Sequence, residues 1–122
     1  MIIRDMQPGD LHRVYEINQE NIPAVGEESL DRLGQLREYS SIALVIESDE
    51  QVVGFCIVLP HNTPYQSPNY LYFCERYTDL IYLDRVAITA EYQGRGWGAQ
   101  LYRVVEERST ASWFALEVNV VP

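Results

Sequence analysis

The 122-residue chain is long enough for one domain with a substantial core, and its hydrophobic content of 47% is that of a globular protein. All nine basic residues are arginine, and 18 acidic residues give a formal net charge of −9. This balance argues against a general nucleic-acid-binding protein, which needs a basic surface, and is compatible with a cationic or amine-bearing partner.

The first forty residues predict a strand and two helices. A short apolar run at residues 2–4 is typical of a strand. Residues 7–10 introduce an amphipathic helix that begins at Leu11 and is ended by Pro23. A second amphipathic helix is expected to begin after Ser29, which is a suitable N-cap.

The middle of the chain predicts a β-hairpin, a loop and a short helix. Residues 42–46 and 52–58 are nearly all apolar, as strands covered on both faces should be, and a short polar segment separates them. The proline-containing segment 60–69 is a predicted loop, and residues 69–76 a predicted short helix. Its three aromatic residues are expected to cover the sheet, with a substrate pocket as the alternative: Tyr70, Tyr72 and Phe73.

The last third predicts a strand at residues 80–88, a glycine-rich turn, a helix from about Arg95 to Arg108 and a final strand at residues 113–121. The complete order is a strand, two helices, a β-meander and a βαβ unit. This order predicts a single α+β domain over residues 1–122, built on a mixed central sheet.

The turn at residues 92–99 carries the most specific signal. Its three glycines remove side chains from one short loop, so that backbone amides can approach a bulky anion, and the following helix adds free amides and the positive end of its dipole. This combination predicts a pyrophosphate-binding turn.

A dinucleotide is one ligand that the turn could hold. Gly94, Gly96 and Ala99 fit the G-x-G-x-x-A fingerprint, and Glu117 lies at about the right distance for its acidic residue. However, residues 89–93 separate the turn from its strand, and the turn comes too late in the chain for a doubly wound sheet to follow. We therefore rank a dinucleotide as a minor alternative.

Residues 85–98 resemble the acetyl-CoA-binding motif of the GNAT N-acetyltransferase superfamily. The core pattern Q/R-x-x-G-x-G/A is met by Gln93, Gly96 and Gly98. The likeness covers residues 80–120 in sequence and the whole chain in the order of its elements. It implies the three-layer GNAT acyl-CoA N-acyltransferase fold, with acetyl-CoA as co-substrate.

The resemblance also implies how the coenzyme is held and what it reacts with. The turn would bind the pyrophosphate, and the preceding strand would pair with the pantetheine arm. The implied cofactor-binding residues are Val86, Ala87, Ile88, Gln93, Gly94, Arg95, Gly96, Trp97, Gly98 and Ala99. A primary amine of a small molecule, an amino acid or a protein would attack the thioester directly in a ternary complex.

Three residues match positions that carry catalytic groups in some GNAT relatives: Asp84, Glu117 and Tyr82. Strand alternation predicts Tyr82, Asp84 and Val86 on one face, and Leu83, Arg85 and Ala87 on the other. A structural alternative applies to both carboxylates. Asp84 would simply pair with an arginine such as Arg85 or Arg76. Glu117 would only hydrogen-bond the backbone where, as the resemblance implies, its strand and the preceding strand splay apart.

Relatives of this kind continue past the position of Pro122 with a helix and two strands. We therefore expect a truncated form of a longer protein, a fold completed by a second copy in a homodimer, or a non-catalytic acyl-CoA-binding module. Cys56 and Cys74 are too few for a disulfide framework, and the sequence shows no metal-ligand cluster, signal peptide or membrane-length apolar run. A cytoplasmic protein without a metal or a membrane partner is expected.

Overall fold

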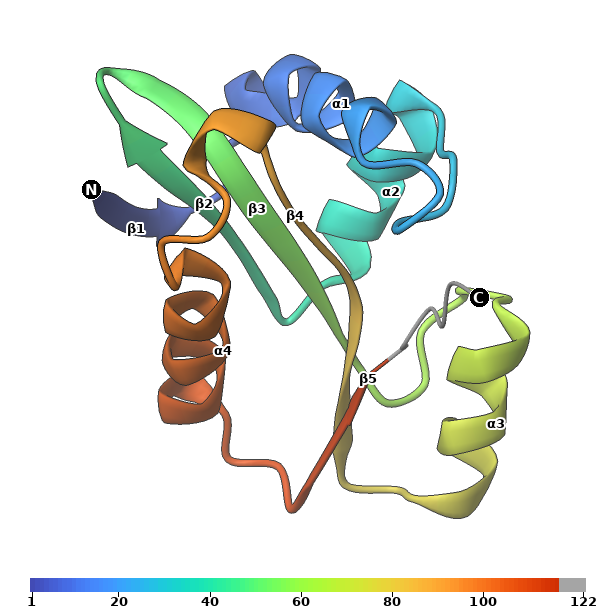
Figure 1. Cartoon of the computed structure of the whole chain (residues 1–122). Coiled ribbons are helices and arrows are strands. Elements are labelled where there is room, and N and C mark those ends of the chain that lie inside the picture. Colours follow the sequence, from blue (N-terminus) through green and yellow to red (C-terminus); the bar gives the residue numbers. More distant parts are fainter. Residues whose placement is uncertain (117–122) are drawn as a thin grey trace.

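A five-stranded mixed sheet forms the centre of the computed structural model, which describes residues 1–116 (Figure 1). Its spatial order, β1-β2-β3-β4-β5, is the order of the strands in the chain; the first four are antiparallel neighbours, and β5 is parallel to β4. The strands are β1 (Ile2–Asp5), β2 (Ile42–Ser48), β3 (Gln51–Pro60), β4 (Leu80–Ile88) and β5 (Trp113–Leu116). Glu117 and the rest of the strand predicted at residues 113–121 lie outside the described residues.

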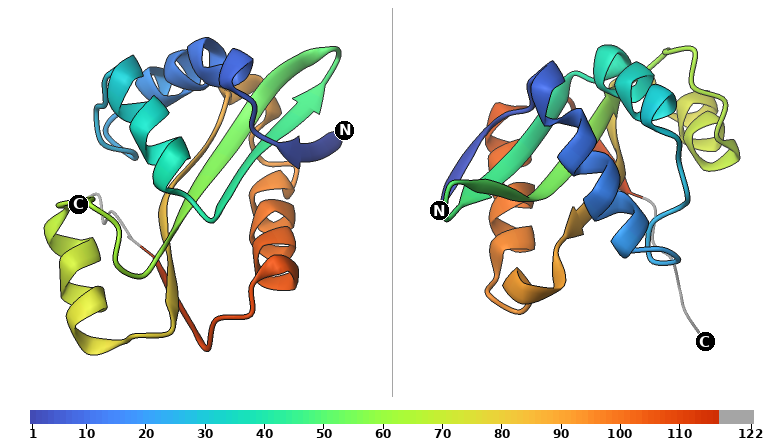
Figure 2. Two further views of the ribbon diagram at one scale, coloured as in Figure 1. Left: turned by 180° about the vertical axis from the view of Figure 1, so that it is seen from behind. Right: turned by 90° about the horizontal axis from the view of Figure 1, so that it is seen from above.

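Helices cover both faces of this sheet. They are α1 (Leu11–Glu20), α2 (Leu30–Tyr39), α3 (Pro68–Arg76) and α4 (Trp97–Arg108), with short 3-10 turns η1 (Pro8–Asp10) and η2 (Ala90–Tyr92). Side chains of α1, α2 and α3 pack into one hydrophobic cluster, and those of α4 pack into a second. Figure 2 shows α4 on the opposite face of the sheet from α1 and α2. The central strand β3 is buried from position 52 to position 59, as its apolar sequence predicts. The order of elements and the mixed sheet confirm the predicted fold class.

The helix boundaries follow from local chemistry. Ser29 caps α2 as expected, because its Oγ accepts the backbone amide of Arg32 at 3.1 Å. The predicted start of α4 at Arg95 is wrong by two residues. Gly94 and Gly96 both have φ of +78°, a left-handed conformation that a right-handed helix cannot include, so α4 begins at Trp97.

Two of the three aromatic residues of α3 cover the sheet as predicted. Tyr70 is fully buried and Phe73 packs against the same cluster. Tyr72 does not: it is about half exposed, and the guanidinium of Arg76 lies 3.6 Å from its ring centroid. No helix in residues 1–116 combines the length and the apolar character needed to cross a bilayer.

A bulge in β4 overturns the predicted alternation of its side chains. Ile57 of β3 pairs with Arg85, but the next residue, Val58, pairs with Leu83, so Asp84 is an extra residue on β4. The alternation therefore shifts at Asp84. Tyr82 and Ala87 belong to the cluster under α1 and α2, whereas Leu83 and Val86 belong to the cluster under α4.

Candidate active site

The glycine turn presents a row of unpaired backbone amides. The left-handed Gly94 and Gly96 shape the loop, and Gly96 is the N-cap of α4. The first bond into the helix runs from the amide of Gln100 to the carbonyl of Gly96 at 3.2 Å. Within residues 1–116, the six amides from position 94 to position 99 have no hydrogen-bond acceptor. Together with the dipole of α4, they form an anion-binding site of the kind that the sequence predicts.

Among residues 1–116, nothing pairs with the β5 side of β4 beyond Leu83, and we call this stretch the open edge of β4. In the described residues, β5 pairs with β4 only from Leu80↔Trp113 to Leu83↔Leu116. On the other edge, the amide of Thr89 donates to the carbonyl of Val53 at 2.8 Å. Because hydrogen-bonded positions alternate in an antiparallel pair, Ala87 also turns its amide and carbonyl toward β3, whereas Val86 and Ile88 turn theirs toward the open edge.

Gln93 connects the turn to this edge. Its Nε2 donates to the carbonyl of Ile88 at 2.7 Å and lies 3.3 Å from Oδ1 of Asn21, just after α1. Gly98, in the first turn of α4, faces the same strand end, where an added Cβ would lie 3.7 Å from Cδ1 of Ile88. The structure thus brings the predicted residues of the strand and the turn together, although only Val86 and Ile88 turn their backbone toward the open edge, and the carbonyl of Ile88 already accepts Gln93.

An aromatic stack supports the turn from outside. The rings of Tyr92 and Trp97 are stacked with centroids 5.4 Å apart, and the Arg95 guanidinium lies 4.7 Å and 5.4 Å from these two rings, respectively. The Tyr92 hydroxyl donates to Asp49 at 2.5 Å, and this bond raises the pKa of the phenol. The stack holds a positive charge beside the free amides.

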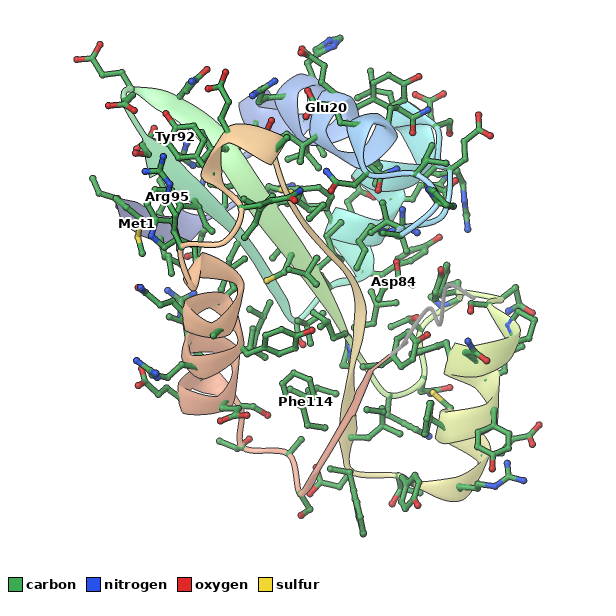
Figure 3. All side chains as sticks on the ribbon, viewed as in Figure 1. Met1, Glu20, Asp84, Tyr92, Arg95 and Phe114 are labelled. Atoms are coloured by element: carbon green, nitrogen blue, oxygen red, sulfur yellow. The ribbon has the colours of Figure 1, made fainter. Side chains whose placement is uncertain are left out.

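A cavity of about 270 Å³ lies on the other side of β4 from this stack. Figure 3 shows Asp84 on that side, away from Tyr92 and Arg95. The walls are the connection between α1 and α2, the loop before α3, and the bulge of β4: Ala24, Val25, Gly26, Glu27, Glu28, Tyr65, Ser67, Leu83, Asp84, Arg85 and Val86. Three of these are acids and one is an arginine, so the cavity favours a cation.

Asp84 lies in this cavity wall, but its carboxylate is fully engaged. Its side chain is 1% exposed; Oδ1 accepts the Tyr65 hydroxyl and Oδ2 accepts Nε of Arg85, both at 2.7 Å. Burial raises the pKa of Tyr65, and the negative charge of Asp84 adds to the shift. Burial alone would lower the pKa of Arg85, but the charge and hydrogen bonds of Asp84 outweigh it and raise that pKa. The alternative stated for Asp84, pairing with Arg85, is therefore present, and a catalytic role of Asp84 stays a prediction.

The other two catalytic candidates differ from Asp84. Tyr82 is fully buried, packs edge-on against Tyr70 with centroids 5.4 Å apart, and does not line the cavity. Glu117 lies outside the described residues. Sequence reasoning missed Tyr65, because nothing in its loop indicates a partner 19 positions away. Among residues 1–116, no group of three or more His, Cys, Asp or Glu residues could hold a metal ion.

Comparison with protein families decides the assignment. The sequence profile described as "Acetyltransferase (GNAT) family" matches residues 11–119, which is most of the chain. The chain belongs to the GNAT acetyltransferase family. The predicted resemblance to this family is therefore confirmed. A search of curated proteins gives no match.

Solved structures agree with the family at the level of the fold. A ribosomal-protein-alanine N-acetyltransferase from Brucella melitensis biovar Abortus superposes with a TM-score of 0.72 at 18% identity, covering 99% of this chain and 82% of that one. A GNAT acetyltransferase from Brucella melitensis in complex with acetyl-CoA gives 0.72 at 19% identity, covering 98% and 76%. An aminoglycoside 6'-N-acetyltransferase from Acinetobacter haemolyticus gives 0.72 at 14% identity, covering 98% and 81%.

Proposed function

We propose that this GNAT domain transfers the acetyl group of acetyl-CoA to a primary amine, by direct attack in a ternary complex. The observation that carries the proposal is the row of six amides at the start of α4 that have no acceptor within residues 1–116. Two further features lie along β4: its open edge, and the acidic cavity at its bulge. A diphosphate needs several donors at once, and the turn supplies them without side chains in the way.

The coenzyme would lie across these features in order. Its pyrophosphate would accept the amides at positions 94–99, with Arg95 adding a positive charge. Its pantetheine arm would pair as an extra strand with the backbone of Val86 and Ile88, the positions that face the open edge. The thioester would then lie toward the bulge at Asp84, next to the cavity. Each group of the coenzyme then meets a part of the chain with matching chemistry.

The acceptor would enter the cavity as an ammonium ion, attracted by its acidic lining. Glu27 is exposed on the cavity and has no hydrogen bond or ion pair within the described residues, so it is free to receive a proton directly or through water. The neutral amine nitrogen then attacks the thioester carbonyl carbon. The C–N bond forms and the C–S bond breaks; the nitrogen releases its second proton to solvent, and the departing thiolate takes one proton up from solvent. Asp84 would hold the site in shape, because both of its oxygens are already bonded.

The test is release of coenzyme A thiol from acetyl-CoA in the presence of amino acids, polyamines, aminoglycosides and peptides with a free N-terminus. We expect release with at least one cationic amine and none with the corresponding alcohol. Gly9→Ala is the control for a glycine substitution in the turn, because Gly9 lies in η1 and an added Cβ there meets nothing within 4 Å. Tight binding of acetyl-CoA without release for any amine would instead identify a non-catalytic acyl-CoA-binding module.

A further inference from the structure

A chain of buried hydrogen bonds joins the walls of the acidic cavity to the bulge of β4. The Tyr65 hydroxyl donates to Asp84 Oδ1, and Arg85 Nε donates to Asp84 Oδ2, both at 2.7 Å. Arg85 Nη1 then donates to Asn18 Oδ1 at 2.9 Å and to the carbonyl of Gly26 at 3.2 Å. We call these five residues the clasp. It ties the loop before α3, the strand β4, the helix α1 and the connection between α1 and α2 into one unit.

The side chains at the centre of the clasp are buried, and their polar atoms have hydrogen-bond partners. The side chains of Asp84 and Arg85 are 1% and 6% exposed, and Asn18 is fully buried. No buried side-chain nitrogen or oxygen in residues 1–116 lacks a hydrogen-bond partner. A buried ion pair is weak evidence for stability, because desolvation offsets its attraction. The hydrogen bonds of the clasp are directional, however. The planar guanidinium of Arg85 and the carboxylate of Asp84 fix the angles at which their partners lie.

We propose that Tyr65 and Arg85 are positioning residues for the amine acceptor. The clasp holds two walls of the cavity that lie outside helices and strands, the loop before α3 and the connection between α1 and α2, against the bulge where the thioester would lie. This inference rests on the proposed function, because it assigns the cavity to the acceptor. No clasp residue belongs to the glycine turn, so the clasp shapes the acceptor site without holding the coenzyme.

Tyr65→Phe removes a single hydroxyl from the clasp and leaves the buried Asp84–Arg85 pair intact. We expect the KM of the best amine to rise about tenfold, which is the scale of one hydrogen bond to a charged group, with kcat and the KM of acetyl-CoA changed less than about twofold. Tyr39→Phe is the matched control. Tyr39 is half-buried against the same hydrophobic cluster but does not line the cavity.

Hydrogen exchange of the protein without ligands gives a second readout that needs no activity. Amides in segments 22–29 and 61–67 should exchange faster in Tyr65→Phe than in wild type or Tyr39→Phe, while those at positions 92–99 stay the same. An unchanged amine KM in an active Tyr65→Phe enzyme would overturn the inference. If wild type transfers acetyl to no amine, the proposed function fails, and the exchange rates alone decide whether the clasp holds the walls.

Discussion

Replacing Gly96 with alanine tests whether the left-handed turn ahead of α4 is the coenzyme site. Gly96 has φ of +78°, and an added Cβ would meet no atom within 4 Å. The substitution therefore creates no clash within the protein, and its cost is conformational. An L-residue in the left-handed region costs about 1–2 kcal/mol more than glycine.

This cost appears in one of two ways. If the turn keeps its shape, the free energy of unfolding falls by about 1–2 kcal/mol, and Tm falls by roughly 4 °C for each kcal/mol. If the turn relaxes to escape the strain, coenzyme binding must restore it, and Kd for acetyl-CoA rises by about 5- to 30-fold. Crowding of the diphosphate by the new methyl group adds to the loss of affinity in both cases.

Isothermal titration calorimetry with acetyl-CoA measures the affinity, and thermal unfolding measures the stability of the same samples. Gly9→Ala provides the control, and we expect it to bind like wild type. If Gly96→Ala were to keep both the affinity and the Tm of wild type, the reasoning from the left-handed turn would be refuted.

Three further substitutions or measurements test other parts of the structure. Asp84→Ala leaves the Arg85 guanidinium buried without its main partner, so the free energy of unfolding in urea should fall by about 3–5 kcal/mol. The control is Asp31→Ala at an exposed position, which should change it negligibly. A small loss in Asp84→Ala would mean that the clasp is not formed. The Arg4 guanidinium donates a hydrogen bond to Asp10, which lowers the pKa of the Asp10 carboxyl in the folded protein. Asp10 therefore stabilises the fold fully at pH values above its unfolded pKa of about 4, and this stabilisation is lost as the pH falls through the lower pKa of the folded state. Asp10→Asn should therefore lose less stability than wild type between pH 7 and pH 3, and equal losses would contradict this pairing. Burial raises the pKa of the Cys56 thiol to about 12, whereas Cys74 is partly exposed, so a thiol reagent at pH 8 should label one cysteine in the native protein and two in urea. If Cys56 reacted as fast as Cys74 in the native protein, the hydrophobic core around Cys56 would be accessible to the reagent, contrary to the structure.

Periodicity and capping predicted the elements of this fold well because they are local. The strand at residues 80–88, the cap at Ser29 and the hairpin strands all depend on residues close in sequence, and all are present in the structure. The bulge at Asp84 escaped prediction, because it depends on how β4 registers against β3. The prediction that side chains alternate along β4 assumes a regular strand without a bulge. It therefore placed Val86 on the face of Tyr82, whereas Val86 packs into the cluster under α4.

The candidate site divides in the same way. The glycine turn is a contiguous motif, and its conformation could be anticipated from Gly94 and Gly96. The clasp could not, because Asn18 and Arg85 are 67 positions apart and only the packing of α1 on β4 brings them together. The roles of Tyr82 and Glu117, a homodimer and a cytoplasmic location stay predictions. Sedimentation and cell fractionation test the last two.

The central claim is that the main-chain amides at the start of α4, which have no acceptor within residues 1–116, hold the diphosphate of coenzyme A. An NMR titration of amide resonances with coenzyme A, compared with pantetheine, tests it most directly. We predict that coenzyme A shifts the amides at positions 94–99 most strongly, and that pantetheine, which lacks the diphosphate, leaves them nearly unchanged while still perturbing Val86 and Ile88. Saturable binding of coenzyme A that leaves the amides of the glycine turn unshifted would contradict the account.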